Sequence, residues 1–281
     1  SDSPTIWKPK DPSGLTFGTN GFYLDFEDSA NLGNDVNGGT DWTEVNLAAA
    51  DQATDTPTNN FCTWNPLHGP RATGQSPSYA EGNTTALCDD DGYSTNSSST
   101  MGMSGGKWYI EMKLLALGGV NTAIGLIADD DNAGGGGGLI SYADISMYTI
   151  TGKKGDYSSG TDYGDSWTTN DIISIAFDAD NGTVWFAKNG TWQASATEGE
   201  IEAGTTTNAA RSSMTMGKSW LIACFGYMAS SVKATFALNT GNPSYANSSD
   251  AADENGYGKF EYAPPSGYLA LCTKNLGSDG G

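Results

Sequence analysis

The segment from Ile172 to Gln193 constrains the fold of this chain more than any other, because two tight turns divide it into short apolar runs. Asn181-Gly182 and Asn189-Gly190 each lie between such runs, and Asn-Gly readily adopts the positive φ angles of a two-residue hairpin turn. Between the turns, Val184 and Phe186 point to one side and their neighbours to the other, which is the period of a β-strand. The segment therefore predicts a three-stranded antiparallel meander.

Short apolar segments separated by glycines and polar residues recur along the chain. Further strands are expected at residues 83–87, 106–115, 123–128, 146–151, 220–227 and 232–238. Within 106–115, Trp108, Ile110 and Met112 share one face. The run Ile172–Phe177 has little polar relief, which is typical of a strand covered on both faces. Many short strands, with no long segment of period 3.6, predict an all-β fold, an antiparallel β-sandwich.

The polarity of the chain divides it into regions. Residues 1–59 are expected to form an extended N-terminal arm, with one strand at Gly21–Phe26 and a polar, glycine-rich stretch after it. Residues 60–275 are expected to form the sandwich, with a C-terminal strand packing back, and residues 276–281 a tail. Because the arm has too few apolar residues for a core of its own, it is expected to pack against other proteins or other copies of this chain.

The charge excludes some partners. The chain carries 33 acidic and 13 basic residues, a formal net charge of −20. A field of this sign repels phosphate backbones and anionic membrane surfaces, so the sequence predicts no nucleic-acid binding. The longest candidate for a membrane span, Leu114–Ala128, is interrupted by Gly118-Gly119. No membrane insertion is therefore expected.

The four cysteines lie far apart and form no CxxC motif. A zinc ribbon is therefore not expected. In a chain of this length they are interpreted as core thiols, with one disulfide as the alternative if the protein meets oxidising conditions. The four are Cys62, Cys88, Cys224 and Cys272.

Several motifs, in order, resemble those of a SPRY-type domain. They are "SSSTMGMSGGKWYIEMKLL", "NTAIGLIA" and "YGDSWTTNDIISIAFDADNGTVWFAKNGTWQAS", which together lie within residues 61–240. One departure is Asn170, which stands before Asp171 where the family usually has glycine. The resemblance implies a concanavalin-like, jelly-roll-like β-sandwich.

The flanking segments are similar to those around SPRY-like domains in virion proteins of tailed bacteriophages, marine ones in particular. They are "NGFYLDFEDSANLGNDVNGGTDWTEVNLAAADQATDTPTNNFCTWNPL" and "FEYAPPSGYLALCTKNL". This resemblance implies a structural protein on the virion surface, as a fibre, tail or capsid-decoration component. Its partners would be other virion proteins, copies of itself or a host-surface glycan.

One loop region gathers aromatic and acidic residues that could bind a sugar. Sugars stack on exposed aromatic rings and bond to carboxylates, and loops at one end of a sandwich commonly bind ligands. The alternative is that Trp167 and Tyr163 belong to the core pattern. The candidates are Asp156, Tyr157, Asp162, Tyr163, Asp165 and Trp167.

Two acidic runs could bind Ca²⁺, which prefers hard oxygen ligands, although neither has the spacing of an EF-hand loop. Exposed charge on turns is the simpler interpretation, and no cofactor is expected apart from this calcium alternative. The runs are Asp89, Asp90 and Asp91, and Asp129, Asp130 and Asp131.

The sequence predicts no enzyme. His68 is the only histidine, and it lies in a proline-flanked turn without nearby partners in the sequence. A glycan-cleaving enzyme of the concanavalin type would need two carboxylates flanking the sugar bond. The closest sets are Asp25, Glu27 and Asp28, and Glu198, Glu200 and Glu202, and neither lies in an aromatic-lined strand. A lectin-like module and a glycan-cleaving enzyme remain the alternatives to a structural virion protein.

Overall fold

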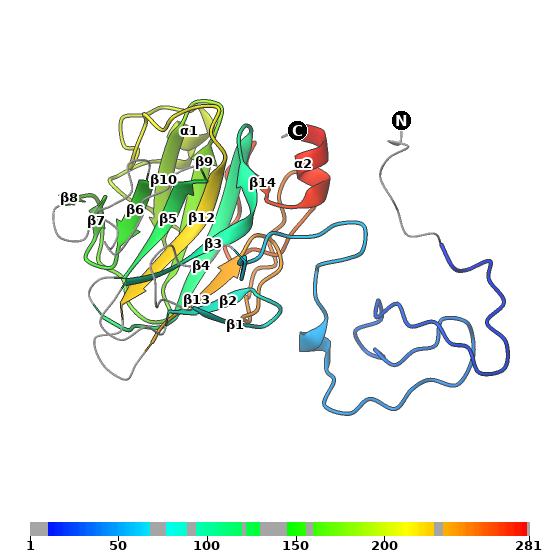
Figure 1. Cartoon of the computed structure of the whole chain (residues 1–281). Helices are drawn as coiled ribbons and strands as arrows, with labels where there is room; N and C mark the ends of the chain where they lie inside the picture. Colours follow the sequence, from blue (N-terminus) through cyan, green and yellow to red (C-terminus); the bar gives the residue numbers. More distant parts are fainter. Residues whose placement is uncertain are drawn as a thin grey trace. The chain divides into compact units, whose positions relative to one another are not determined.

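The computed structural model describes residues 11–67, 77–88, 94–119, 122–129, 145–155, 160–227 and 233–279. The chain divides into two compact units, residues 1–60 and residues 61–281. The larger unit is a sandwich of two β-sheets (Figure 1). The expected all-β, concanavalin-like sandwich is therefore confirmed.

Within the described residues, the first sheet has eight strands in the order β1-β2-β13-β4-β9-β10-β11, with β14 beside β4. Neighbouring strands are antiparallel except that β14 runs parallel to β4. The strands are β1 (Ser78–Ala80), β2 (Thr85–Cys88), β4 (Lys107–Ala116), β9 (Ile172–Asp178), β10 (Thr183–Lys188), β11 (Thr191–Trp192), β13 (Ala234–Asn239) and β14 (Leu269–Ala270).

The second sheet has six antiparallel strands in the order β3-β12-β5-β6-β7-β8 in the described part of the chain. They are β3 (Ser94–Met103), β5 (Ala123–Ala128), β6 (Ile145–Thr149), β7 (Lys153–Lys154), β8 (Thr161–Asp162) and β12 (Trp220–Tyr227). Two short helices, α1 (Glu198–Glu202) and α2 (Thr273–Asp279), complete this unit. Residues 276–279, expected as part of a tail, continue α2, and Leu276 packs against the main core.

The predicted meander forms as β9, β10 and β11, in register from Thr183 opposite Asp178 to Lys188 opposite Ile173. β9 is buried along its whole length, as expected for a strand covered on both faces. In β10 the alternation also holds, because Val184 and Phe186 face the main core whereas Trp185 belongs to a second cluster.

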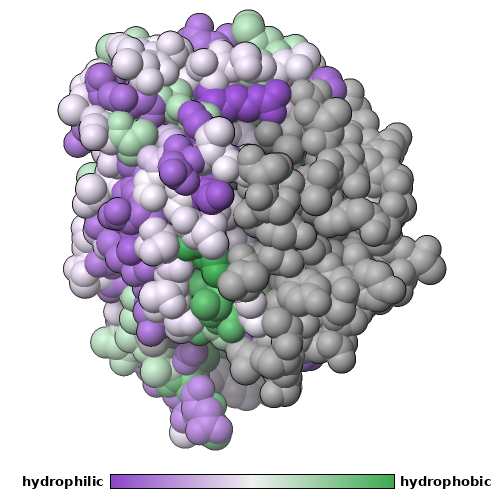
Figure 2. All heavy atoms as spheres, turned by 90° about the vertical axis from the view of Figure 1, so that its left-hand side faces the viewer, coloured by the Kyte–Doolittle hydropathy of each residue, from purple (hydrophilic) through white to green (hydrophobic). Residues whose placement is uncertain are grey.

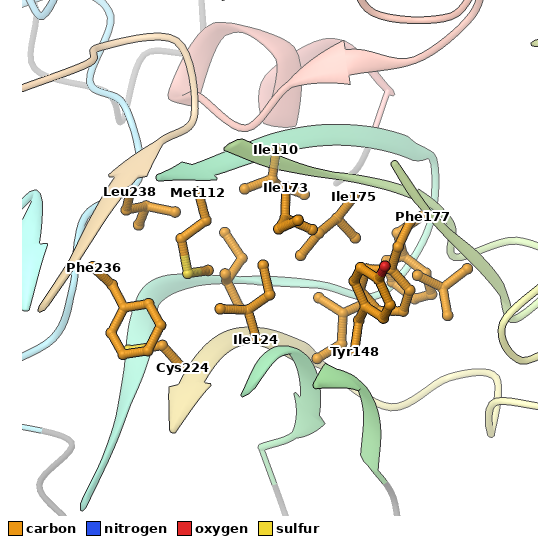
Figure 3. Packing of buried hydrophobic residues seen from close by; sticks show 14 of the residues in the cluster. Ile110, Met112, Ile124, Tyr148, Ile173, Ile175, Phe177, Cys224, Phe236 and Leu238 are labelled. Carbon is orange, nitrogen blue, oxygen red and sulfur yellow. The ribbon is translucent and has the colours of Figure 1, made fainter. Parts of the chain in front are cut away.

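The main core lies between the sheets. Figure 3 shows Ile110, Ile173 and Ile175 of the first sheet pointing toward Ile124 and Tyr148 of the second. All four cysteines are buried in the apolar clusters, which confirms their interpretation as core residues.

Strand β3 was not expected, because its sequence "STNSSSTMGM" has no apolar alternation. Its three serines 97–99 are buried, and the hydroxyl groups of Ser97 and Ser99 have partners inside the sandwich. Ser97 Oγ and Tyr79 Oη lie 2.9 Å apart, and Ser99 Oγ accepts a 3.0 Å bond from the Ile222 N–H at a register shift between β3 and β12. The buried hydroxyls therefore replace apolar packing in this strand.

The outer face of the first sheet is covered by the C-terminal cover, which is the name used here for residues 240–279. Phe260 and Tyr268 of the cover pack with Tyr109 and Trp185 of the sheet and with Ile201 of α1. This second apolar cluster explains why β4 and β9 are buried on both faces.

A buried carboxylate joins the cover to the sheet. Glu111 of β4 is fully buried and accepts bonds from the backbone N–H groups of Glu261 (2.9 Å) and Tyr262 (2.7 Å). Asn239 Nδ2 donates at 3.0 Å, and the hydroxyl groups of Tyr109 and Tyr245 lie at 3.2 and 3.3 Å. Five donors therefore converge on one carboxylate.

The smaller unit differs from the sequence prediction. The expected strand at residues 21–26 does not form, and this prediction was wrong: the Tyr23 N–H bonds the carboxylate of Asp35 at 2.9 Å, and Phe26 has a φ of 57°. The described residues 11–60 consist of turns and loops with one 3-10 helix, η1 (Ala49–Asp51). That residues 1–59 form an extended arm stays a prediction.

Candidate interaction surface

The segment 160–171 leads from β8 of the second sheet to β9 of the first, and its backbone is tied to the turn after β6. The N–H groups of Tyr163 and Gly164 both donate to Gly152 O at 3.0 Å, and Trp167 N–H donates to Ile150 O at 3.0 Å. This segment holds four of the six residues that the sequence proposed for ligand binding; Asp156 and Tyr157 lie outside the described residues.

Its two aromatic side chains are part of the core. Tyr163 and Trp167 are only 6% and 4% exposed, and both rings pack beside Tyr148 at centroid distances of 5.7 and 6.2 Å. The Tyr163 hydroxyl accepts a 3.2 Å bond from Phe186 N–H, and burial raises the pKa of Tyr163 to about 12. Neither ring offers a face on which a sugar could stack, so the structure places both in the core, the alternative that the sequence had left open.

Its acidic side chains lie outside. Asp162 and Asp165 are both exposed. The backbone beneath them is held in place, because Asp165 N–H donates to Gln193 Oε1 at 2.7 Å and the Tyr148 hydroxyl donates to Asp165 O. The segment therefore presents carboxylates on a backbone that buried side chains position.

Residues that the sequence did not single out complete this surface. Lys188 Nζ donates to Ser166 O at 2.7 Å and lies 3.5 Å from the carboxylate of Asp171. Asn189 Nδ2 donates to Asp171 at 2.7 Å. Burial alone would raise the pKa of Asp171, but the bonds from Asn189 and Thr168 N–H and the charge of Lys188 outweigh it and lower the pKa.

We call this surface the polar rim, defined by Asp162, Asp165, Ser166, Asp171 and Lys188. Figure 2 shows the side of the molecule on which β7 and β8 lie in Figure 1, and the coloured residues there are mostly hydrophilic or near neutral. The Asn189-Gly190 turn was predicted from the sequence. The contact between Asn189 and Asp171, however, depends on the pairing of β9 and β10.

Comparison with known proteins identifies the larger unit. Residues 107–239, from the start of β4 to the end of β13, match the model of the SPRY domain. The chain contains a SPRY domain. The solved SPRY domain of human HERC1 is similar over 62% of this chain and 96% of its own length, with a TM-score of 0.47 and 13% identity. So distant a likeness adds nothing about function. No curated protein matches the sequence.

The SPRY match ends at Asn239, before the C-terminal cover begins. Even so, the cover supplies β14, which pairs with Trp108 and Tyr109 of β4. Asp253 fixes this strand, because its carboxylate accepts from Ala270 N–H at 2.9 Å and from Asn275 Nδ2 at 2.7 Å. The SPRY domain and its cover are thus one packed unit.

The acidic runs proposed for calcium lie mainly outside the described residues, which include Asp129 but not Asp89, Asp90, Asp91, Asp130 or Asp131. Asp129 is exposed, and its N–H donates to Ser219 O at 2.8 Å. In the described part of the chain, no three histidine, cysteine or acidic residues are placed to hold a metal ion. Nor does any described helix have the length and apolarity to cross a membrane.

The carboxylate sets weighed for glycan cleavage shape turns and caps. Asp25 accepts from Glu27 N–H at 3.0 Å, and Asp28 accepts from Ala30 N–H at 2.9 Å. In α1, Glu200 accepts from the Thr197 N–H at 2.8 Å in a capping box. Asp25, Asp28 and Glu200 therefore bond nearby backbone groups, and His68 lies outside the described residues.

Proposed function

We propose that this chain is a non-catalytic interaction protein whose SPRY domain binds another protein through the polar rim. SPRY domains mediate protein–protein interaction, which supports a protein partner. The proposal places the contact on Asp162, Asp165 and Lys188, at one end of the sandwich.

The observation that supports this choice most directly is the way the rim is built. Its exposed charges lie on segments fixed from beneath by Tyr148, Tyr163 and Gln193. A binding surface that is ordered before the partner arrives avoids part of the entropy cost of association. Loops positioned by a rigid scaffold are common binding sites for this reason.

The five rim residues offer carboxylates and one ammonium group, and Tyr163 and Trp167, the two described aromatic residues of the predicted set, are buried. Such a surface suits a partner with complementary charges and hydrogen-bonding groups better than one that needs stacking. Neither of these two rings is available for a sugar to stack on, so the described part of the rim favours a protein partner.

The setting that we propose is the surface of a tailed-bacteriophage virion. This part of the proposal rests on the similarity of residues 20–67 and 260–276 to the flanks of SPRY-like domains in such virion proteins. There the domain would contact other virion proteins or a host-surface molecule, as a fibre, tail or capsid-decoration component.

Site-specific photo-cross-linking tests the proposal. A photoreactive amino acid replaces Asp162 in the full chain, and a matched protein carries it at Gly199, which is exposed on α1. In purified native particles, or in host extract, the first protein should form a discrete protein adduct and the second should not. Adducts from both positions, or an adduct with glycan alone, would contradict a protein-binding rim.

A further inference from the structure

The smaller unit is held together by carboxylate–backbone bonds rather than by an apolar core. Asp35 is buried and accepts from the N–H groups of Tyr23 (2.9 Å), Asn37 (3.1 Å) and Gly39 (3.1 Å). Glu44 accepts from Gly33 N–H at 2.9 Å. Leu32 is the one large apolar side chain buried among the described residues of this unit.

Most large apolar side chains of this unit are exposed. Seven of the ten large hydrophobic residues that are exposed in the described part of the chain lie in it. They are Leu15, Phe22, Phe26, Val36, Trp42, Val45 and Leu47. Exposed apolar side chains gathered in one region are characteristic of interaction sites.

Two of these side chains form a defined pair. Phe22 and Trp42 are 49% and 54% exposed and pack edge to face, with ring centroids 4.9 Å apart. The backbone holds Trp42 in place, because its N–H donates to Gly33 O at 2.8 Å. Exposed Val36 is joined by its N–H to Tyr23 O at 3.0 Å, next to Phe22. Aromatic side chains that are fixed in this way make effective anchors in protein interfaces.

The negative charge of the smaller unit indicates what kind of partner the pair would bind. Residues 11–60 contain nine carboxylates and no lysine, arginine or histidine. A second copy of this chain is a poor match, because residues 61–281 carry 23 acidic and 11 basic residues. A surface with the opposite sign would gain both association rate and specificity.

We infer that the Phe22–Trp42 pair is the anchor of a second interaction surface, which binds a different protein. That partner presents an apolar pocket surrounded by lysine or arginine side chains. This surface belongs to the smaller unit and the polar rim to the larger one, so one chain could join two partners.

Peptide binding tests this inference without a known partner. The full chain is screened against a library of random peptides, and the selected peptides are titrated by fluorescence anisotropy at low and high salt. We expect them to combine apolar with Lys or Arg residues and to bind more weakly at high salt. Trp42→Ala should weaken binding by about tenfold or more, the loss typical of an interface anchor.

Matched variants show whether peptide binding depends on the Phe22–Trp42 pair. Met216→Ala removes an exposed hydrophobic side chain (63% exposed) from the SPRY-containing unit and should leave peptide binding unchanged. Asp162→Ala with Asp165→Ala alters the polar rim and should also leave it unchanged. Peptides that lack basic residues, or that bind Trp42→Ala equally well, would overturn the inference. So would sedimentation showing a dimer of the full chain that Trp42→Ala dissociates.

Discussion

Replacing Glu111 by alanine should remove a large part of the stability of the SPRY-containing unit. Three of its five donors have positions that the chain fixes: the backbone N–H groups of Glu261 and Tyr262 and the side-chain amide of Asn239. A buried donor left without a partner costs about 1–3 kcal/mol. Two effects offset part of the summed cost of the three unpaired donors: a charge no longer has to be buried, and water can enter the vacated space. We expect a net loss of about 3–5 kcal/mol, against a typical total of about 5–15 kcal/mol.

The stability of Glu111→Gln should lie between that of the alanine variant and that of the wild type. Its single carbonyl oxygen can keep the donors that now bond Oε2, namely Asn239, Tyr245 and Glu261. Its amide group then faces the Tyr262 N–H, which loses its acceptor. One unpaired backbone donor predicts a loss of about 1–3 kcal/mol.

Urea unfolding followed by tryptophan fluorescence measures these differences in the free energy of unfolding. Glu81→Gln, at an exposed turn, is the matched control and should change stability by less than about 0.5 kcal/mol. A loss below about 1 kcal/mol for Glu111→Ala would show that the five bonds contribute little net stability, and would refute the reasoning.

The same residue predicts a pH dependence. Burial raises the pKa of Glu111 above its usual 4.5, although the N–H groups of Glu261 and Tyr262 oppose the shift. The folded chain therefore binds this proton at higher pH than the unfolded chain, so the residue's contribution to stability falls as pH rises through the window above 4.5. The difference in stability between wild type and Glu111→Gln should grow as pH is lowered toward 4.5, by at most about 1.4 kcal/mol per pH unit. A difference independent of pH in that window would contradict the assignment.

Three further predictions concern the packing. Gly125→Ala places a methyl group against the carbonyl of Ser146 and 2.9 Å from the Cα of Met147. Thermal unfolding should therefore show a loss of stability of about 1–3 kcal/mol. Its control, Gly199→Ala, meets open space and should not destabilise the chain. Thr197→Ala removes the N-cap of α1 and should cost about 1 kcal/mol in the same assay; an unchanged midpoint would argue against the capping box. A chain ending at Asn239 lacks the C-terminal cover and should lose the cooperative unfolding transition in circular dichroism, and a sharp transition would show that the cover is dispensable.

The strands that could be predicted from the sequence are those whose own residues carry the periodicity. The expected segments 123–128 and 220–227 match β5 and β12 in full, and the Asn-Gly turns at 181–182 and 189–190 separate β9, β10 and β11 as predicted. Alternation within a few residues and turn chemistry are local properties, so they can be predicted from the sequence alone.

Other features depended on partners distant in the sequence. Ser97 and Ser99 of β3 can be buried because Tyr79 and Ile222 lie within hydrogen-bonding distance of their hydroxyl groups, whereas the alternating segment 21–26 found no partner strand and formed a loop. Tyr163 and Trp167 are residue types that are common in sugar-binding sites. In the folded chain, however, both are buried and pack beside Tyr148.

Glu111 shows most clearly why sequence alone was not enough. In the sequence it is one polar residue of a strand, on the face opposite Trp108 and Ile110. Its bonding partners Asn239, Glu261 and Tyr262 lie 128 to 151 residues further along the chain, and only the folding of the cover onto the sheet brings them together. Periodicity therefore predicts which residues share a face of a strand. Whether that face meets water or a buried partner depends on long-range packing.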